Sequence, residues 1–198
     1  MDDSEKSSNL MHDTITAIPL LEITADTRAL LIQCLPEESI QQWLHVEGRE
    51  TIGHREEGDR EGKSLHMVFF VNEVPMGWAG WLQYVPHPSW VQTTTYLTPS
   101  MWGTGLNACA KGLLYKVAVA ANIHLIASTQ DENMRSRRAL EKLWPTQTPW
   151  HVWEENRRRW ANVFSLSVPP KPYVTWDDAV VESIVQRVRS IPLPQIQP

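Results

Sequence analysis

Cysteine is scarce in this chain of 198 residues, where it occurs only as Cys34 and Cys109. Two cysteines cannot build a disulfide framework, and no Cys-x-x-Cys or His/Cys spacing indicates a zinc site. The sequence therefore predicts a reducing compartment and no bound metal.

Long apolar runs are also absent. No stretch approaches the ~18 residues that a membrane span requires. Residues 1–11 are polar and acidic, and they lack the basic start and apolar segment of a signal peptide. We therefore expect a cytoplasmic protein that does not bind membranes.

Basic residues are in deficit, with 18 Lys and Arg against 23 Asp and Glu, so the formal net charge is −5. Binding to a phosphate backbone requires a basic surface, which argues against nucleic acid as a partner. The charge still allows a local basic pocket. The remaining composition, 42% apolar and 21% charged, is typical of a folded globular chain.

The length suits one α/β domain. We expect a disordered N-terminus over residues 1–12, a folded domain over 13–168, and a C-terminal extension with a short helix over 169–198. Hydrophobic periodicity and turn residues predict strands at 15–21, 64–71, 75–84, 90–97, 123–128, 152–153 and 163–168. They predict helices at 29–35, 40–46, 106–121, 134–143 and 177–189. The charged segment 47–63 contains four glycines and is predicted to be a loop.

The three strands between residues 64 and 97 follow one another through short connections, which predicts an antiparallel meander. A strand–loop–helix–strand unit follows over residues 90–128. This order predicts an α/β (α+β) fold with a mixed, mostly antiparallel central sheet flanked by helices.

A glycine pair, Gly103-Thr-Gly105, stands directly before the predicted helix at 106–121. In this position the backbone N–H groups of residues 102–107 can bind an anion, and the helix N-terminus adds partial positive charge. A simple tight turn is an alternative. A dinucleotide site is another, because Gly103 to Ala108 fits G-x-G-x-x-[GA] and Asp131 follows near the end of the next strand.

Two features argue against a dinucleotide site. A Rossmann strand is apolar and runs directly into its first glycine, whereas residues 93–98 are half polar and Pro99 intervenes. A doubly wound sheet should also begin with this unit, but a meander precedes it. Walker A is excluded because no Gly-Lys-[ST] follows the glycines.

A coenzyme A loop fits better, because two motifs occur in order after the meander. The first is Trp-Gly-Thr-Gly-Leu-Asn at 102–107, between a strand and a helix. The second is Asn-Met-Arg-Ser at 133–136, in a predicted helix that ends with Lys-Leu-Trp at 142–144. Through these motifs, residues 64–144 resemble the GNAT superfamily of N-acetyltransferases.

Departures from the general motif indicate one branch of that superfamily. Trp102 replaces the usual Gln or Arg, and Asn107 replaces a small residue. Both features are similar to the branch that contains ribosomal-protein N-terminal acetyltransferases, and so is the closing segment from Arg157 to Trp176. Trp144-Pro145 stands in place of Gly-Phe and deviates at the end of the second helix.

The resemblance implies acetyl-CoA as the co-substrate. The backbone around Tyr96, Leu97 and Thr98 would pair with the pantetheine arm and polarise the thioester carbonyl; the alternative is that these residues only complete the sheet. The pyrophosphate would be bound by the loop residues Trp102, Gly103, Thr104, Gly105, Leu106 and Asn107.

On the second helix, the resemblance implies that Asn133 contacts the pantetheine arm. It also implies that Ser136, one turn away on the same side, lies near the sulfur and protonates the leaving thiolate. Helix capping is the alternative role of both residues. The 3′-phosphate of the coenzyme would meet Arg138 or Lys111, which otherwise belong to a solvated helix face.

The general base is not evident from the sequence. Glu73 at the expected hairpin turn and His87 in the loop before the third strand are candidates, and deprotonation through ordered water is an alternative. Further candidates are His54, Glu56 and Asp131. Cys109 has no evident base partner and is predicted to be a small core residue rather than a nucleophile.

Together these features predict an enzyme that moves an acetyl group directly from acetyl-CoA to a primary amine in a ternary complex. The acceptor is a protein N-terminus, by the branch resemblance, or a small-molecule amine, and the enzyme is a monomer or a homodimer. An alternative is a non-catalytic acyl-CoA-binding or regulatory module of the same fold. The lack of an obvious base and the Trp144-Pro145 deviation motivate that alternative.

Overall fold

Three strands that follow one another in sequence form the centre of the sheet: β2 (Ser64–Val71), β3 (Val74–Gln83) and β4 (Val91–Leu97). The turn between β2 and β3 consists of Asn72 and Glu73, whose φ angles are 49° and 68°. Two successive residues with positive φ are typical of a tight hairpin turn. The predicted meander is confirmed, and its strand ends agree within one residue.

The computed structural model describes residues 13–34, 48–83, 90–155, 158–171 and 176–190. The chain divides into two units, Met1–Gly80 with Thr95–Ala110 and Trp81–Thr94 with Lys111–Pro198. The predicted disordered segment 1–12 and the predicted helix 40–46 lie outside the described residues.

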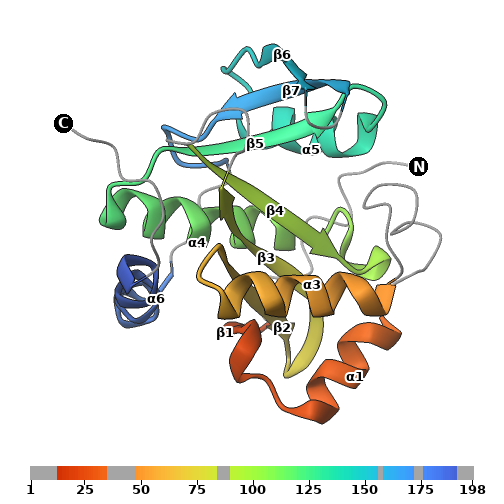
Figure 1. The fold of residues 1–198 in the computed structure, drawn as a ribbon, viewed down its shortest axis with the longest axis vertical. Coiled ribbons are helices and arrows are strands. Elements are labelled where there is room, and N and C mark those ends of the chain that lie inside the picture. The colour runs from red at the N-terminus through yellow and green to blue at the C-terminus, as the bar shows by residue number, and fades with distance from the viewer. Residues whose placement is uncertain (1–12, 35–47, 84–89, 156–157, 172–175, 191–198) are drawn as a thin grey trace. The chain divides into compact units, whose positions relative to one another are not determined.

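Within the described residues, the strand order of the seven-stranded sheet is β1-β2-β3-β4-β5-β7-β6 (Figure 1). β1 (Ile15–Pro19) pairs antiparallel with β2, whereas β5 (Leu125–Gln130) pairs parallel with β4. β7 (Arg159–Ser165) is antiparallel to both β5 and β6 (Trp150–Glu154). The sheet is therefore mixed and mostly antiparallel, which confirms the predicted fold class.

Some strand ends differ from the prediction for local reasons. β1 stops at Pro19, and the next residues form the 3-10 turn η2 (Leu20–Glu22), in which Leu20 is buried. β5 begins at Leu125 rather than residue 123, because the N–H of Ile123 still donates to Ala118 of the preceding helix. β7 begins directly after Arg158, whose φ of 49° marks the hairpin turn.

Five helices are present in the described part of the chain. They are α1 (Ala25–Gln33), α3 (Gly48–Arg60), α4 (Leu106–Ala121), α5 (Met134–Leu143) and α6 (Asp178–Ser190). The bounds of α4 and α5 match the sequence prediction. The N-cap of α1 is Thr24, whose side-chain oxygen accepts from the N–H of Thr27.

Helix α3 corrects the prediction of a loop over residues 47–63. Thr51 and Ile52 are each 1% exposed, so one side of the helix is buried, while Glu50, Glu57 and Arg60 are exposed. Its glycines therefore do not mark a loop. At Gly58, a Cβ atom would lie 2.7 Å from the Ser64 hydroxyl, so this glycine allows close packing of the helix on β2.

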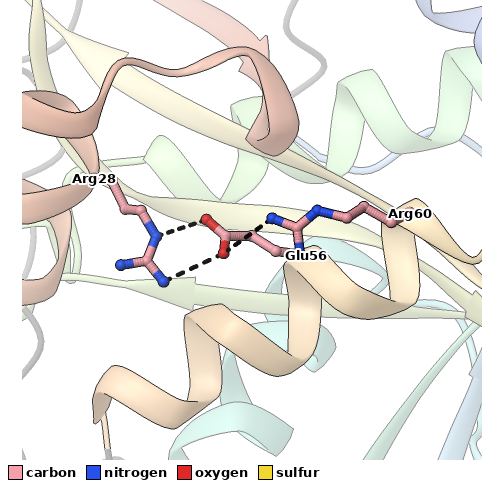
Figure 2. Close-up of polar contacts among 3 residues, drawn as sticks. All are labelled: Arg28, Glu56 and Arg60. Carbon is pink, nitrogen blue, oxygen red and sulfur yellow. Dashed lines mark hydrogen bonds and ion pairs between the residues drawn. The ribbon is translucent and has the colours of Figure 1, made fainter.

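An ion pair joins α1 to α3 in the first unit (Figure 2). The carboxylate of Glu56 accepts from Arg28 at 2.6 and 3.2 Å and lies 3.6 Å from Arg60. Beneath it, Leu31 and Ile52 belong to a buried cluster with Val68 and other apolar residues of the sheet. The two helices therefore cover one face of β2 and β3.

The C-terminal helix α6 belongs to the second unit. Val181, Ile184, Val185 and Val188 are buried along one side of it. The neighbouring Trp176 carbonyl accepts from Lys116 of α4 at 3.0 Å. The predicted terminal helix is confirmed, and it is packed rather than free. No helix in the described ranges is long and apolar enough to cross a membrane.

Candidate functional site

The predicted glycine loop joins β4 to α4. After β4 the chain makes the 3-10 turn η3 (Pro99–Met101), and α4 begins at the buried Leu106. Gly103 and Gly105 are exposed, with φ angles of 80° and 97°. These are left-handed backbone conformations that favour glycine, so the sequence needs both glycines here.

Several backbone N–H groups of this loop form no hydrogen bond within the described residues. Within the described part of the chain, the N–H groups of Gly103, Gly105 and Asn107 donate to no protein acceptor. By contrast, the N–H groups of Trp102 and Thr104 donate to carbonyls inside the loop. Unused amides at a helix N-terminus can bind the oxygens of a phosphate group.

Trp102 fastens the loop to the end of β4. Its indole Nε1 donates to the carbonyl of Leu97 at 2.9 Å, and its side chain is 37% exposed. Thr104 adds a second internal bond through its hydroxyl, which donates to the Met101 carbonyl at 2.8 Å. The departure of Trp102 from the general motif therefore has a structural role.

The end of β4 leaves few backbone groups for a ligand. The N–H of Thr98 donates to Met76 of β3 at 2.9 Å, and its carbonyl accepts from Met101. The carbonyl of Leu97 is occupied by Trp102. Because backbone groups alternate sides along an antiparallel strand, the N–H of Leu97 points away from β3. Of the backbone groups predicted to meet the coenzyme, this one has a suitable direction.

The second motif opens α5. Asn133 is the N-cap, and its side-chain oxygen accepts from the N–H of Ser136 at 3.1 Å. The capping alternative therefore holds for Asn133, while its amide NH₂ stays available as a donor. The hydroxyl of Ser136, a half-buried residue, bonds to no group among the described residues. Arg138 is exposed on the same helix.

These candidates fall in both units. Tyr96, Leu97, Thr98 and the loop 102–107 belong to the first unit, and Asn133, Ser136 and Arg138 belong to the second. The structure brings the members of each group together within their unit.

Lys111 differs from the expectation of a solvated helix face. It is 4% exposed, and its ammonium donates to the Thr93 hydroxyl at 2.6 Å. Burial lowers the pKa of Lys111 to about 7. Its side chain is directed into the second unit rather than to solvent, so it is not placed to meet a 3′-phosphate.

Two of the five candidate bases are held in other polar contacts. Glu56 is the partner of Arg28 and Arg60. The two carboxylate oxygens of Asp131 accept from Asn162 at 2.6 Å and contact the ring of His151 at 2.7 Å. Both carboxylates therefore already have structural partners.

The other three candidates have fewer constraints. Glu73 is exposed at the β2–β3 turn, and His54 is exposed on α3 rather than in a loop. His87 lies outside the described residues. None of these positions selects one residue as the base.

A buried histidine that the sequence analysis did not single out lies on β2. His66 is 0% exposed, and its Nδ1 lies 2.7 Å from the carboxylate of Asp59 on α3. A histidine in the otherwise apolar stretch 64–71 was the available signal. Its partner was hidden because the segment that holds Asp59 was interpreted as a loop.

The two remaining expectations concern buried residues. Trp144 is 1% exposed, and its indole donates to the Val168 carbonyl at 2.8 Å. It therefore closes α5 as a core residue, and the Trp144-Pro145 deviation has a packing reason. Cys109 is buried as predicted, and burial raises the pKa of its thiol to about 11. A thiol with that pKa is a poor nucleophile at neutral pH.

A mixed sheet with a glycine loop between a central strand and a helix defines an acyl-CoA N-acetyltransferase fold. Residues 17–143 match the family model described as acetyltransferase (GNAT) domain. The match covers more than half of the chain, so the protein belongs to the GNAT acetyltransferase family, whose members use acetyl-CoA. Membership implies N-acetyltransferase activity.

Solved structures agree with this fold. RimL, a ribosomal L7/L12 alpha-N-protein acetyltransferase, shares 13% identity at a TM-score of 0.58, covering 77% of this chain and 94% of that one. Spermidine N-acetyltransferase from Vibrio cholerae, solved with CoA and spermine, shares 11% identity at a TM-score of 0.57, covering 77% and 96%. PseH, an N-acetyltransferase from Campylobacter jejuni, shares 11% identity at a TM-score of 0.52, covering 77% and 99%. A search of curated proteins found no match.

Proposed function

We propose that this protein transfers an acetyl group from acetyl-CoA to a primary amine by direct attack in a ternary complex. The observation that carries the proposal is the loop at 102–107, with two exposed left-handed glycines and unused amides directly before α4. Such a loop stabilises a pyrophosphate without a basic side chain, because the amides and the helix N-terminus supply the positive ends of dipoles. We assign the catalytic domain to residues 13–168.

In this proposal the N–H of Leu97 polarises the thioester carbonyl. A backbone donor fixed in a strand needs no reorganisation as negative charge develops on the oxygen, which is how oxyanion donors lower a barrier. Tyr96 contributes no backbone contact to the pantetheine arm in this proposal, because its N–H and carbonyl point toward β3 by the same alternation. Thr98 takes no direct part, because its N–H and carbonyl are already bonded within the protein.

The residues of the second motif keep the roles that the family resemblance implies. We assign the side-chain NH₂ of Asn133 to the pantetheine arm and the hydroxyl of Ser136 to the leaving thiolate. The unused Ser136 hydroxyl supports that role, because a proton donor must be free to turn toward the sulfur. Arg138 is exposed and can meet the 3′-phosphate.

For the acceptor we propose a protein N-terminus. The Trp102 and Asn107 variants resemble the branch with ribosomal-protein N-terminal acetyltransferases, and the fold is similar to that of RimL. A small amine is the second candidate, because the fold is equally similar to a spermidine N-acetyltransferase.

A thiol-release assay with acetyl-CoA tests both assignments. The amine panel contains short peptides with free N-termini, the same peptides with blocked N-termini, and spermidine. Release with free but not blocked peptides, with the product located by mass spectrometry, is the expected result. Release with spermidine alone would move the protein to the small-amine class. Tight CoA binding without release on any amine would favour the non-catalytic binding module.

A further inference from the structure

Gly77 of β3 has an unusual backbone conformation for a strand residue. Its φ angle is 140°, a value that L side chains rarely adopt. A Cβ atom on this residue would lie 2.2 Å from the carbonyl oxygen of Tyr96 and 2.8 Å from Cα of Leu97. Both distances are shorter than a Cβ atom can have to a backbone atom, so glycine alone fits. A glycine inside a strand often marks the close approach of another backbone, which here is that of β4.

Two contacts anchor β4 on β3, one on either side of Leu97. The N–H of Thr98 donates to the Met76 carbonyl at 2.9 Å, and Tyr96 stacks on Trp78 with ring centroids 4.9 Å apart. With these partners in an antiparallel pair, the glycine of β3 lies opposite Leu97. All of these residues belong to the first unit.

The φ angle of Gly77 sets the geometry between the two contacts. It is the rotation about the N–Cα bond that joins the peptide with the Met76 carbonyl to the backbone that leads into Trp78. A change of φ to the negative values of ordinary strand residues would turn one contact relative to the other. β4 could then not keep both the hydrogen bond and the ring stack in their present positions.

Leu97 is the residue whose position depends on this geometry. Its N–H points away from β3 and is the group that we assign to the thioester carbonyl. Its own carbonyl accepts from the Trp102 indole at 2.9 Å, and the residue is 8% exposed. Leu97 is therefore held by β3, by Trp102 and by its burial, and together these fix the direction of its N–H.

We propose that Gly77 is a positioning residue for acetyl transfer. It allows the backbones of β3 and β4 to approach at Leu97, and so directs the N–H of Leu97 toward the thioester oxygen. A donor that is fixed before the reaction stabilises the negative charge that develops on this oxygen without further rearrangement. The role of Gly77 is indirect, because it acts through Leu97. This inference rests on the proposed function.

Gly77→Ala and Gly80→Ala form a matched pair of variants. Gly80 also lies on β3, and a Cβ atom on it would lie 2.3 Å from the Leu65 carbonyl of β2. Both variants therefore press β3 against a neighbouring backbone, but only Gly77→Ala does so at the proposed thioester strand. Saturating acetyl-CoA favours the folded state of each variant, and rates are expressed per folded molecule.

With the best amine of the panel, Gly77→Ala should lower kcat about 100-fold, because a displaced oxyanion donor has an effect of that size. Its Kd for CoA should stay close to that of the wild type, since the loop at 102–107 is unchanged. Gly80→Ala should keep the wild-type kcat. A loss of stability alone changes kcat per folded molecule in neither variant, so equal kcat values for the two would overturn the proposal.

Infrared spectroscopy reports the hydrogen bond to the thioester directly. Acetyl-CoA labelled with ¹³C at its acetyl carbonyl is bound without an amine, and its C=O stretch should move to lower frequency in the wild type and in Gly80→Ala. In Gly77→Ala the band should return toward the frequency of free acetyl-CoA. A Gly77→Ala protein with the full shift would contradict the proposal. So would a wild type that releases thiol but shows no shift.

NMR of isotope-labelled wild-type protein needs no variant to fold. An α-proton contact between Gly77 and Leu97 is expected, and the amide resonance of Leu97 should differ between the CoA and acetyl-CoA complexes. The amide of Thr98, which is bonded to Met76, should differ little. An absent contact or an unchanged Leu97 amide would refute the role of Gly77, whether or not Gly77→Ala folds.

The two levels of inference fail differently. If the wild type releases no thiol with any amine, the proposed function fails and this inference fails with it. If the wild type turns over and Gly77→Ala does so as fast as Gly80→Ala, only the role of Gly77 fails.

Discussion

Replacement of Lys111 by methionine should stabilise the protein and remove a pH dependence. The ammonium of Lys111 is 4% exposed and has the Thr93 hydroxyl, at 2.6 Å, as its hydrogen-bond partner. A hydroxyl returns little of the hydration free energy that a buried cation loses. Methionine keeps a similar length without the charge, so Lys111→Met should fill the same space.

The size of the effect follows from the pKa of Lys111. Its ordinary value is 10.5, and burial lowers it to about 7. In the interval between these values the unfolded chain holds the proton and the folded chain does not. The free energy of unfolding of the wild type therefore rises with pH across that interval. At about 1.4 kcal/mol per pH unit, the whole interval corresponds to about 5 kcal/mol.

After subtraction of about 1 kcal/mol for the lost hydrogen bond to Thr93, Lys111→Met should be more stable than the wild type by about 4 kcal/mol at pH 7. The advantage should shrink by about 2 kcal/mol at pH 9, because the wild type then loses less by deprotonation. Urea unfolding, followed by the fluorescence of the ten tryptophans, measures both values.

The matched control for this experiment is Lys142→Met, which changes an exposed lysine on α5. Its unfolding free energy should lie within about 0.5 kcal/mol of the wild type at either pH. A Lys111→Met protein that is less stable than the wild type at pH 7 would refute the reasoning. A stability difference that does not change with pH would refute it equally, because the ammonium would then not be desolvated.

Four further substitutions test the loop, the second motif and α3. Gly105→Val should abolish CoA binding in calorimetry, because valine strains a backbone with φ of 97°, whereas Gly53→Ala, where nothing lies within 4 Å of the added atom, should bind CoA normally. Asn133→Ala should lower the free energy of unfolding by about 1 kcal/mol, because the N-cap hydrogen bond from the N–H of Ser136 is lost. Ser136→Ala should lower kcat about 100-fold with a melting temperature close to that of the wild type; equal activity would remove Ser136 from the mechanism. Glu56→Gln should lower the free energy of unfolding by about 2 kcal/mol, because its carboxylate neutralises two arginines, and unchanged urea unfolding would contradict that role.

The sequence predicted the region from residue 64 to residue 143 well because its periodicities are strong. β2 is buried along its whole length, and α4 carries apolar and small residues at helical spacing. The glycine loop was also predictable, since its chemistry depends on backbone conformation that glycine itself indicates. These are local features, and a single sequence contains local information.

The errors involve contacts between one helix or strand and another, which the pattern within a single element does not show. α3 was missed because Gly58 looks like a loop residue until Ser64 is seen packed against it. Lys111 was expected in solvent because its helix position alone does not show that Thr93 lies opposite. His66 and Asp59 were missed together, since neither is notable without the other. In each case the position of the residue depends on tertiary packing, which helical or strand periodicity does not predict.

The buried polar groups in the described part of this protein separate into two kinds, and the difference bears on stability. Glu154 is 0% exposed, but its carboxylate accepts from Ser128 at 2.9 Å and Arg159 at 2.8 Å, so it is neutralised and stabilises the hairpin. His66 and Lys111 are buried with fewer partners than they can use. A satisfied group needs no reason beyond stability. An unsatisfied titratable group weakens the fold, and among the described residues this applies to Nε2 of His66 on β2 and to the ammonium of Lys111.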